Sequence, residues 1–203
     1  VNRIARKVRR GSGLSPSQTH IGQRSKMKAA VRAYPEHGQK SIERKEWLFG
    51  YPAQIGIAVD QIVWSDNMAK ALIAIENGEN KDAVKDFLAF SLEQLEFMVS
   101  LVRGDITRGQ RGLCGAMITI DVHARDVTRS LIRKEVGRQT DFEWTRQLRY
   151  YWEPAQSHGD QEGDCTAKQT NTRFIYGYEY LGNSPRLVIT PLTDMCYMTR
   201  TGA

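Results

Sequence analysis

Two long stretches of the sequence repeat apolar residues at intervals of three and four, which constrains the fold more than any other feature. Within "NKDAVKDFLAFSLEQLEFMVSLVRG", residues 80–104, the repeated positions are Val84, Leu88, Leu92, Leu95, Val99 and Val102. Within "TRGQRGLCGAMITIDVHARDVTRSLIRKEVG", residues 107–137, they are Leu113, Met117, Ile120, Ala124, Val127 and Leu131. This spacing brings the apolar side chains to one face of a helix. The sequence therefore predicts two long amphipathic helices, the first closed by Gly104.

The second of these stretches also has a strand-like character. Residues 117–122 are rich in β-branched residues and alternate in polarity, as strands do. The seam of intervals of three and four nevertheless runs through them without interruption, which favours a helix.

A third apolar face precedes these two stretches. It is formed by Ile55, Val59, Ile62 and Val63. Pro52 suits the first turn of this helix, Ser65 or Asp66 can cap a second segment that runs through Ile75, and Gly78 is a natural stop. Each helix must cover its apolar face, so we predict a helical bundle.

The C-terminal part of the chain has a different pattern. Large rings gather in "DFEWTRQLRYYWEP", which we expect to dock onto the bundle. After the polar loop "AQSHGDQEGD", alternation of Phe174, Tyr176, Tyr178 and Tyr180 predicts a half-buried strand, and "RLVIT" a second short strand. The predicted fold class is mainly α, a helical bundle with a short C-terminal β segment.

The formal net charge of +6 is unevenly distributed. Residues 1–45 hold twelve Lys and Arg against two Glu, so the net charge of the remainder is negative. We expect a solvated, flexible basic arm over residues 1–45, because its Gly, Ser and Gln-rich sequence offers little apolar surface to bury. No apolar run reaches the roughly 18 residues that a membrane helix needs, and no signal peptide is apparent. We therefore expect a soluble intracellular protein that does not bind membranes.

The residues of catalytic chemistry form no recognisable site. Cys114, Cys165 and Cys196 are far apart and not spaced with His as metal ligands, so we expect reduced thiols and no metal site. Asp121 and Arg125 are four residues apart on the predicted helix and are expected to pair on its surface. A phosphate-binding loop needs Gly-Lys, a dipeptide that the chain does not contain. We expect no enzyme activity from this chain alone.

Several longer motifs are more specific. "LVRGDI", "IDVHARDV", "DFEWTRQLRYYWE" and "YGYEYLGNSPRLVITPLTD" occur in this order. Together they resemble dynein heavy chains, more closely the axonemal than the cytoplasmic type, over residues 45–203. In that family the matching region is the C-terminal part of the helical linker, followed by the start of the first AAA+ module. Met195 departs from the family pattern, which usually has Arg after the Asp.

The resemblance implies a mechanical role. It implies that the chain is a linker element of a microtubule-based, ATP-driven motor, with the AAA+ ring, other dynein subunits and microtubules as partners. It also implies a cytoplasmic, cytoskeletal location in the axoneme of a cilium or flagellum. The expected cofactors are none for this chain alone, and ATP and Mg for the parent motor. The residues that match the adenine side of the nucleotide site are Val188, Ile189, Pro191, Leu192 and Thr193.

The expected domains are therefore a basic arm over residues 1–45, a helical linker-like domain over 46–180, and the truncated start of an AAA+ module over 181–203. The alternative is a free-standing helical interaction module, in which the helical body binds a protein partner and the basic arm binds an acidic or nucleic-acid surface. Nucleic acid is not an expected partner of the linker element.

Overall fold

The computed structural model describes residues 16–34, 41–153, 163–182 and 190–202. The described helices are α2 (Pro16–Arg32), α3 (Ser41–Gly50), α4 (Ala53–Glu76), α5 (Ala83–Arg103), α6 (Arg108–Arg133), α7 (Phe142–Thr145) and α8 (Pro191–Gly202). The described strands are β1 (Arg149–Glu153), β2 (Asp164–Gln169) and β3 (Thr172–Ile175). The predicted class, mainly α with a small β segment, is confirmed.

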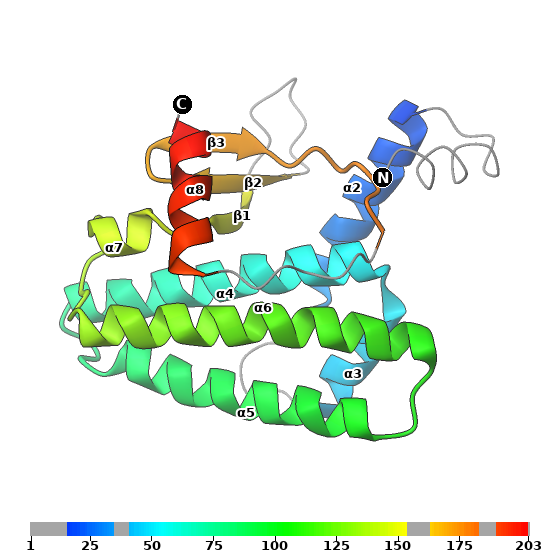
Figure 1. The fold of residues 1–203 in the computed structure, drawn as a ribbon, viewed down its shortest axis with the longest axis horizontal. Coiled ribbons are helices and arrows are strands. Elements are labelled where there is room, and N and C mark those ends of the chain that lie inside the picture. Colours follow the sequence, from blue (N-terminus) through cyan, green and yellow to red (C-terminus); the bar gives the residue numbers. More distant parts are fainter. Residues whose placement is uncertain (1–15, 35–40, 154–162, 183–189, 203) are drawn as a thin grey trace.

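Three long helices form the body of the molecule. Helices α4, α5 and α6 lie side by side, and the chain reverses direction between successive helices (Figure 1). The first reversal uses Gly78, whose φ of +73° is readily adopted only by a residue without a Cβ. The second ends at a capping box, in which Thr107 Oγ1 accepts from Gln110 N–H and the Gln110 side chain accepts from Thr107 N–H.

The ambiguous stretch around residue 117 is helical, as the seam predicted. Leu113, Met117 and Leu131 of that seam are buried in α6. In α5 the predicted face is shifted: Phe87 and Met98 are buried, whereas the predicted residues from Leu88 to Val99 are only half-buried. Helix α5 has apolar residues on more than one face, so its periodicity establishes the helix but not which stripe packs.

The predicted break at Ser65 or Asp66 is wrong. Helix α4 continues from Ala53 to Glu76, and Ser65 is fully buried in its middle. The Ser65 hydroxyl accepts a hydrogen bond from Tyr150 N–H of β1 at 3.0 Å. A residue type typical of helix caps is used here to attach a strand to the helix.

The described part of the basic arm is more ordered than expected. Residues 16–32 form α2, which packs against α4, with Met27 and Ala30 buried in the core. Arg24 donates to the carbonyl oxygen of Gly163 at 2.7 Å, so one basic residue serves a tertiary contact. The amino-acid composition did not predict this helix, because only a few apolar residues on one face are enough to pack it against α4. Residues 1–15 and 35–40 lie outside the described residues, and the division at residue 45 stays a prediction.

The aromatic region docks onto the bundle, as predicted. Strands β1, β2 and β3 form one antiparallel sheet in that order, and β1 packs on α4 (Figure 1). Trp144 is buried beside Trp64 of α4, with ring centroids 5.6 Å apart. The strand predicted around Phe174 ends at Ile175 and continues as an extended segment, and most of "RLVIT" lies outside the described residues.

No described helix combines the length and the hydropathy needed to cross a bilayer.

Candidate functional site

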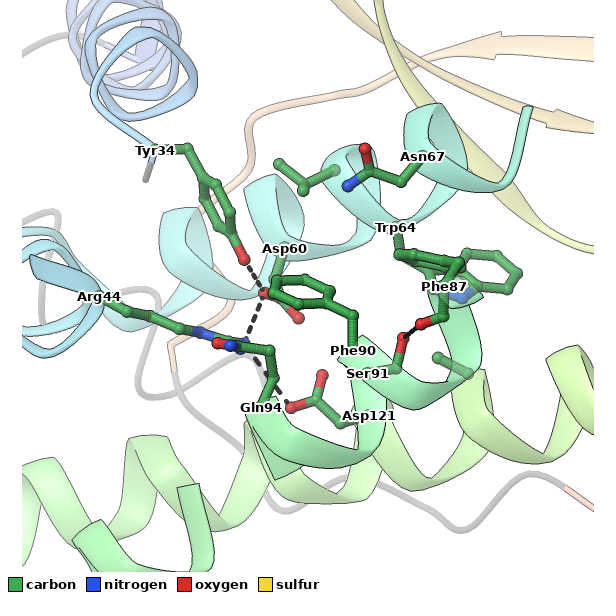
Figure 2. A pocket seen from close by; sticks show the side chains of 12 residues that line it. Tyr34, Arg44, Asp60, Trp64, Asn67, Phe87, Phe90, Ser91, Gln94 and Asp121 are labelled. Atoms are coloured by element: carbon green, nitrogen blue, oxygen red, sulfur yellow. Dashed lines mark hydrogen bonds and ion pairs between the residues drawn. The ribbon is translucent and has the colours of Figure 1, made fainter. Parts of the chain in front are cut away.

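A buried polar cluster joins four helices at the centre of the body. Arg44 of α3 donates to Asp60 Oδ1 of α4 at 3.1 Å and to Gln94 Oε1 of α5 at 2.6 Å. It also lies 3.8 Å from Asp121 Oδ2 of α6. Tyr34, just after α2, donates its hydroxyl to Asp60 at 3.0 Å. Figure 2 shows these side chains converging on the guanidinium and on Asp60.

Burial sets the electrostatics of this cluster. The Arg44 and Asp60 side chains are only 8% and 9% exposed. Burial raises the pKa of Asp121 well above its usual value, and the negative charge of Asp60 raises it further, against the lowering effect of Arg44. The pKa of Tyr34 is also raised, first by burial and then by Asp60. One cation thus faces two carboxyl groups, and the pKa of Asp121 is raised because burial and Asp60 outweigh the effect of Arg44.

The cluster suits positioning better than catalysis. The cavity beside it has a volume of about 50 Å³, far below the roughly 300 Å³ of typical ligand sites. Its cation is an arginine, which does not exchange protons at physiological pH. No group of three or more His, Cys, Asp and Glu able to hold a metal occurs in the described part of the chain. The contacts instead fix how α3, α4, α5 and α6 sit together.

The predicted surface pair of Asp121 and Arg125 does not form. Asp121 points to Arg44, while Arg125 pairs with its neighbour Asp126 at 2.8 Å. Helical spacing allowed the predicted pair, but the burial of Arg44 next to Asp121 decides the partner. A signal was present in the sequence: Asp60 interrupts the apolar run "GIAVDQIVW" on a face that must be buried.

A second region of interest is the attachment of α8. Arg146, just after α7, donates to Asp194 Oδ2 at 3.1 Å, and Thr201 donates to Gln169 Oε1 of β2 at 2.7 Å. Burial lowers the pKa of His123 on α6, while Asp194 and Asp126 act in the opposite direction. Helix α8 is therefore attached to the sheet through Thr201 and to the residue after α7 through Asp194, and Asp194 in its first turn also acts on His123 of α6. Figure 1 shows α8 standing between the sheet and the helical body.

The first turn of α8 carries the described part of the predicted adenine-side set. Thr190 Oγ1 accepts from Thr193 N–H at 3.3 Å, which caps the helix. In return, Thr193 Oγ1 accepts from Thr190 N–H at 2.8 Å and donates to the Thr190 carbonyl oxygen at 3.0 Å. The Leu192 side chain is 73% exposed. Pro191 is the first residue of α8, and Val188 and Ile189 lie outside the described residues. The structure thus places Pro191, Leu192 and Thr193 in the first turn of α8. Their assignment to the adenine side of a nucleotide site stays a prediction.

Comparison with known proteins bears on both regions. Human dynein axonemal heavy chain 1 is 44% identical over 174 residues, and mouse dynein axonemal heavy chain 3 is 41% identical over 180 residues. The chain is homologous to axonemal dynein heavy chains. The ciliary dynein beta chain of Tripneustes gratilla is 39% identical over 178 residues. These alignments cover 86%, 87% and 88% of this chain but about 4% of each relative.

The dynein homology also has a local component. Residues 176–203 match the family described as the hydrolytic ATP binding site of the dynein motor region. The match begins one residue after β3 ends at Ile175 and includes the extended segment and α8. Helices α2 to α7 and the sheet precede it.

Proposed function

We propose that this chain is a mechanical linker element of an axonemal dynein heavy chain, a microtubule-based motor driven by ATP. In this role the helical body shifts as a unit when the nucleotide-binding region rearranges, and the proposed partner is the AAA+ ring. The proposed location is the axoneme of a cilium. The observation that carries the proposal is the order along the chain: a stiff helical body followed by a short extended segment that enters the region matching a dynein ATP site.

The contacts of the body support stiffness. Four helices meet at the buried guanidinium of Arg44, and Ser65 attaches β1 to the middle of α4. Directional contacts of this kind favour one arrangement of the helices, because moving a helix away breaks the hydrogen bonds of Arg44 to Asp60 and Gln94. A body held in this way transmits displacement instead of absorbing it.

For the nucleotide, we propose that Val188, Ile189, Pro191, Leu192 and Thr193 contribute to the adenine side. The exposed apolar side chain of Leu192 suits the face of an adenine ring. The Thr193 hydroxyl is already engaged with Thr190, so its contribution is to fix the backbone of this turn. ATP, when bound with Mg, would supply the phosphoryl chemistry, and the residues proposed here only position the base.

Two measurements test this function. The purified 203-residue chain is expected to show no ATP turnover. Turnover that disappears on substitution of Thr193 or Asp194 would refute the mechanical assignment.

In a complete heavy chain, Leu192→Glu is expected to weaken ATP binding by about tenfold, the cost of burying a charge beside the base. Ile175→Glu is the matched control, since Ile175 is a comparably exposed apolar residue on β3, outside the proposed set. Equal effects of the two substitutions would exclude Leu192 from the nucleotide site.

A further inference from the structure

The extended segment that follows β3 is held by a side chain from the first turn of α4, which is distant in the sequence. Gln54 lies in the first turn of α4 and is only 5% exposed. Its Nε2 donates to Tyr176 Oη at 3.0 Å and to the Glu179 carbonyl oxygen at 2.7 Å. Its Oε1 accepts from Leu181 N–H at 2.8 Å. Three contacts from one amide therefore reach a segment more than 120 positions away along the chain.

These contacts define the orientation of the amide. A flipped Gln54 would place its NH₂ against Leu181 N–H and its oxygen against the Glu179 carbonyl, both repulsive. In the observed orientation the side chain pairs with residues 179 and 181 as a neighbouring strand would, one acceptor and one donor two residues apart. The segment is thereby paired with α4 where the ladder of the sheet no longer supports it.

A separate contact joins the same segment to the sheet. The Tyr178 hydroxyl donates to Asp164 and accepts from Cys165 N–H at 3.0 Å. The Tyr178 backbone has φ of +47°, an unusual value for a residue with a side chain. Tyr178 thus fixes the segment to β2, and Gln54 fixes it to the helical body.

We propose that Gln54 is a positioning residue that latches residues 176–181 to α4, and so couples movement of the ATP-site region to the helical body. This inference rests on the proposed function. All three groups that Gln54 contacts lie within residues 176–203, the part that matches the dynein ATP site. Gln54 is on the first turn of α4, so a force on the segment acts on the N-terminal end of this helix. The same helix contacts Arg44 through Asp60 and β1 through Ser65.

The latch itself can be tested in the 203-residue chain by amide hydrogen exchange. Gln54→Ala is expected to lower the protection of the Leu181 amide by about tenfold, the equivalent of one lost hydrogen bond. Gln61→Ala is the matched control, because Gln61 lies on the same helix and its amide bonds only the Ile57 carbonyl of its own helix among the contacts described. The far-UV spectrum and the protection of core amides in α6 report whether either variant has lost its fold.

A conservative variant separates a latch from general destabilisation. In Gln54→Glu, a protonated carboxyl can still donate to the Glu179 carbonyl and accept from Leu181 N–H, whereas an ionised one repels that carbonyl. Leu181 protection, corrected for the intrinsic exchange rate, is expected to be near wild type at about pH 4 and about tenfold lower at about pH 8. Wild-type protection is expected to stay level over this range. Two results would overturn the latch: Leu181 protection that does not change with pH in Gln54→Glu, or Leu181 protection in Gln54→Ala equal to that of the wild type.

The coupling requires a second readout in a complete heavy chain. Gln54→Ala is expected to leave ATP turnover within about twofold and to lower microtubule sliding velocity severalfold, while Gln61→Ala changes neither. If Gln54→Ala lowers Leu181 protection but leaves the sliding velocity unchanged, the coupling is refuted and the linker proposal stands. A linker without mechanical function would instead show ATP-driven sliding that is insensitive to substitutions throughout the body.

Discussion

Replacing Arg44 by Leu is predicted to destabilise the helical body strongly. The substitution removes the cation that lies 3.1 Å from Asp60 and 3.8 Å from Asp121, and leaves Gln94 without its donor. Solvent screening is weak here, because the Arg44 and Asp60 side chains are less than a tenth exposed. Breaking a buried ion pair by removal of one partner costs about 3–5 kcal/mol. For a chain of this length, that corresponds to a fall in Tm of about 6–20 °C.

The assay is urea unfolding followed by tryptophan fluorescence, which Trp64 beside the cluster makes informative. Lys45→Leu is the control, since Lys45 is exposed and its replacement is expected to change stability by less than about 0.5 kcal/mol. The double variant Arg44→Leu with Asp60→Asn removes both charges and is expected to recover more than about 1 kcal/mol. A single variant that costs less than about 1 kcal/mol, or a double variant no more stable than the single, would show that the cluster does not hold the helices together.

Three further predictions concern other contacts. The pKa of Asp121 is raised in the folded state, so the folded chain binds this proton more tightly than the unfolded chain. The free energy of unfolding should therefore fall as pH rises above about 4. Asp121→Asn should remove that pH dependence in urea titrations. Ser65→Ala should cost about 1 kcal/mol in the same assay, because it removes the part-buried hydrogen bond that Tyr150 N–H donates to the Ser65 hydroxyl. Thr190→Ala should cost about 1 kcal/mol of α8 stability, seen as faster exchange of α8 amides, because it removes the Oγ1 that accepts from Thr193 N–H, whereas Thr190→Ser should retain this cap.

Local periodicity was sufficient to predict the long helices α5 and α6, but it missed α2 and the continuity of α4. The seam through Met117 overrode the strand-like composition of residues 117–122, because a helix of this length can bury its apolar face only if the period is kept throughout. The same reasoning failed for the packed face of α5, where Phe87 and Met98 compete with Leu88 and its neighbours. Which of two apolar stripes is buried depends on the neighbouring helices, and sequence spacing does not contain that information.

The polar contacts were harder to predict because their partners are distant in sequence. Asp121 was expected to pair with Arg125, its helical neighbour, but the buried partner comes from α3, 77 positions earlier, as Arg44. Gln54 gave no signal at all, since a glutamine in a first helical turn is usually solvated. Resemblance to dynein predicted an AAA+ region from residue 181, and the match to the dynein ATP-site family covers residues 176–203. The side chains that join this region to the helical body required coordinates.

Helix α4 is the element that these contacts share, which supports the proposed mechanical coupling. From its first turn to its middle it presents three buried polar side chains, each directed to a different neighbour: Gln54 to residues 176–181, Asp60 to Arg44, and Ser65 to β1. A buried polar group costs free energy unless its partner is in place, so each contact specifies a position and does not merely add cohesion. Displacement of residues 176–181 would therefore move α4 as a rod. The sheet and α3 would move with it, because separation would break the hydrogen bond of Ser65 to β1 and that of Asp60 to Arg44.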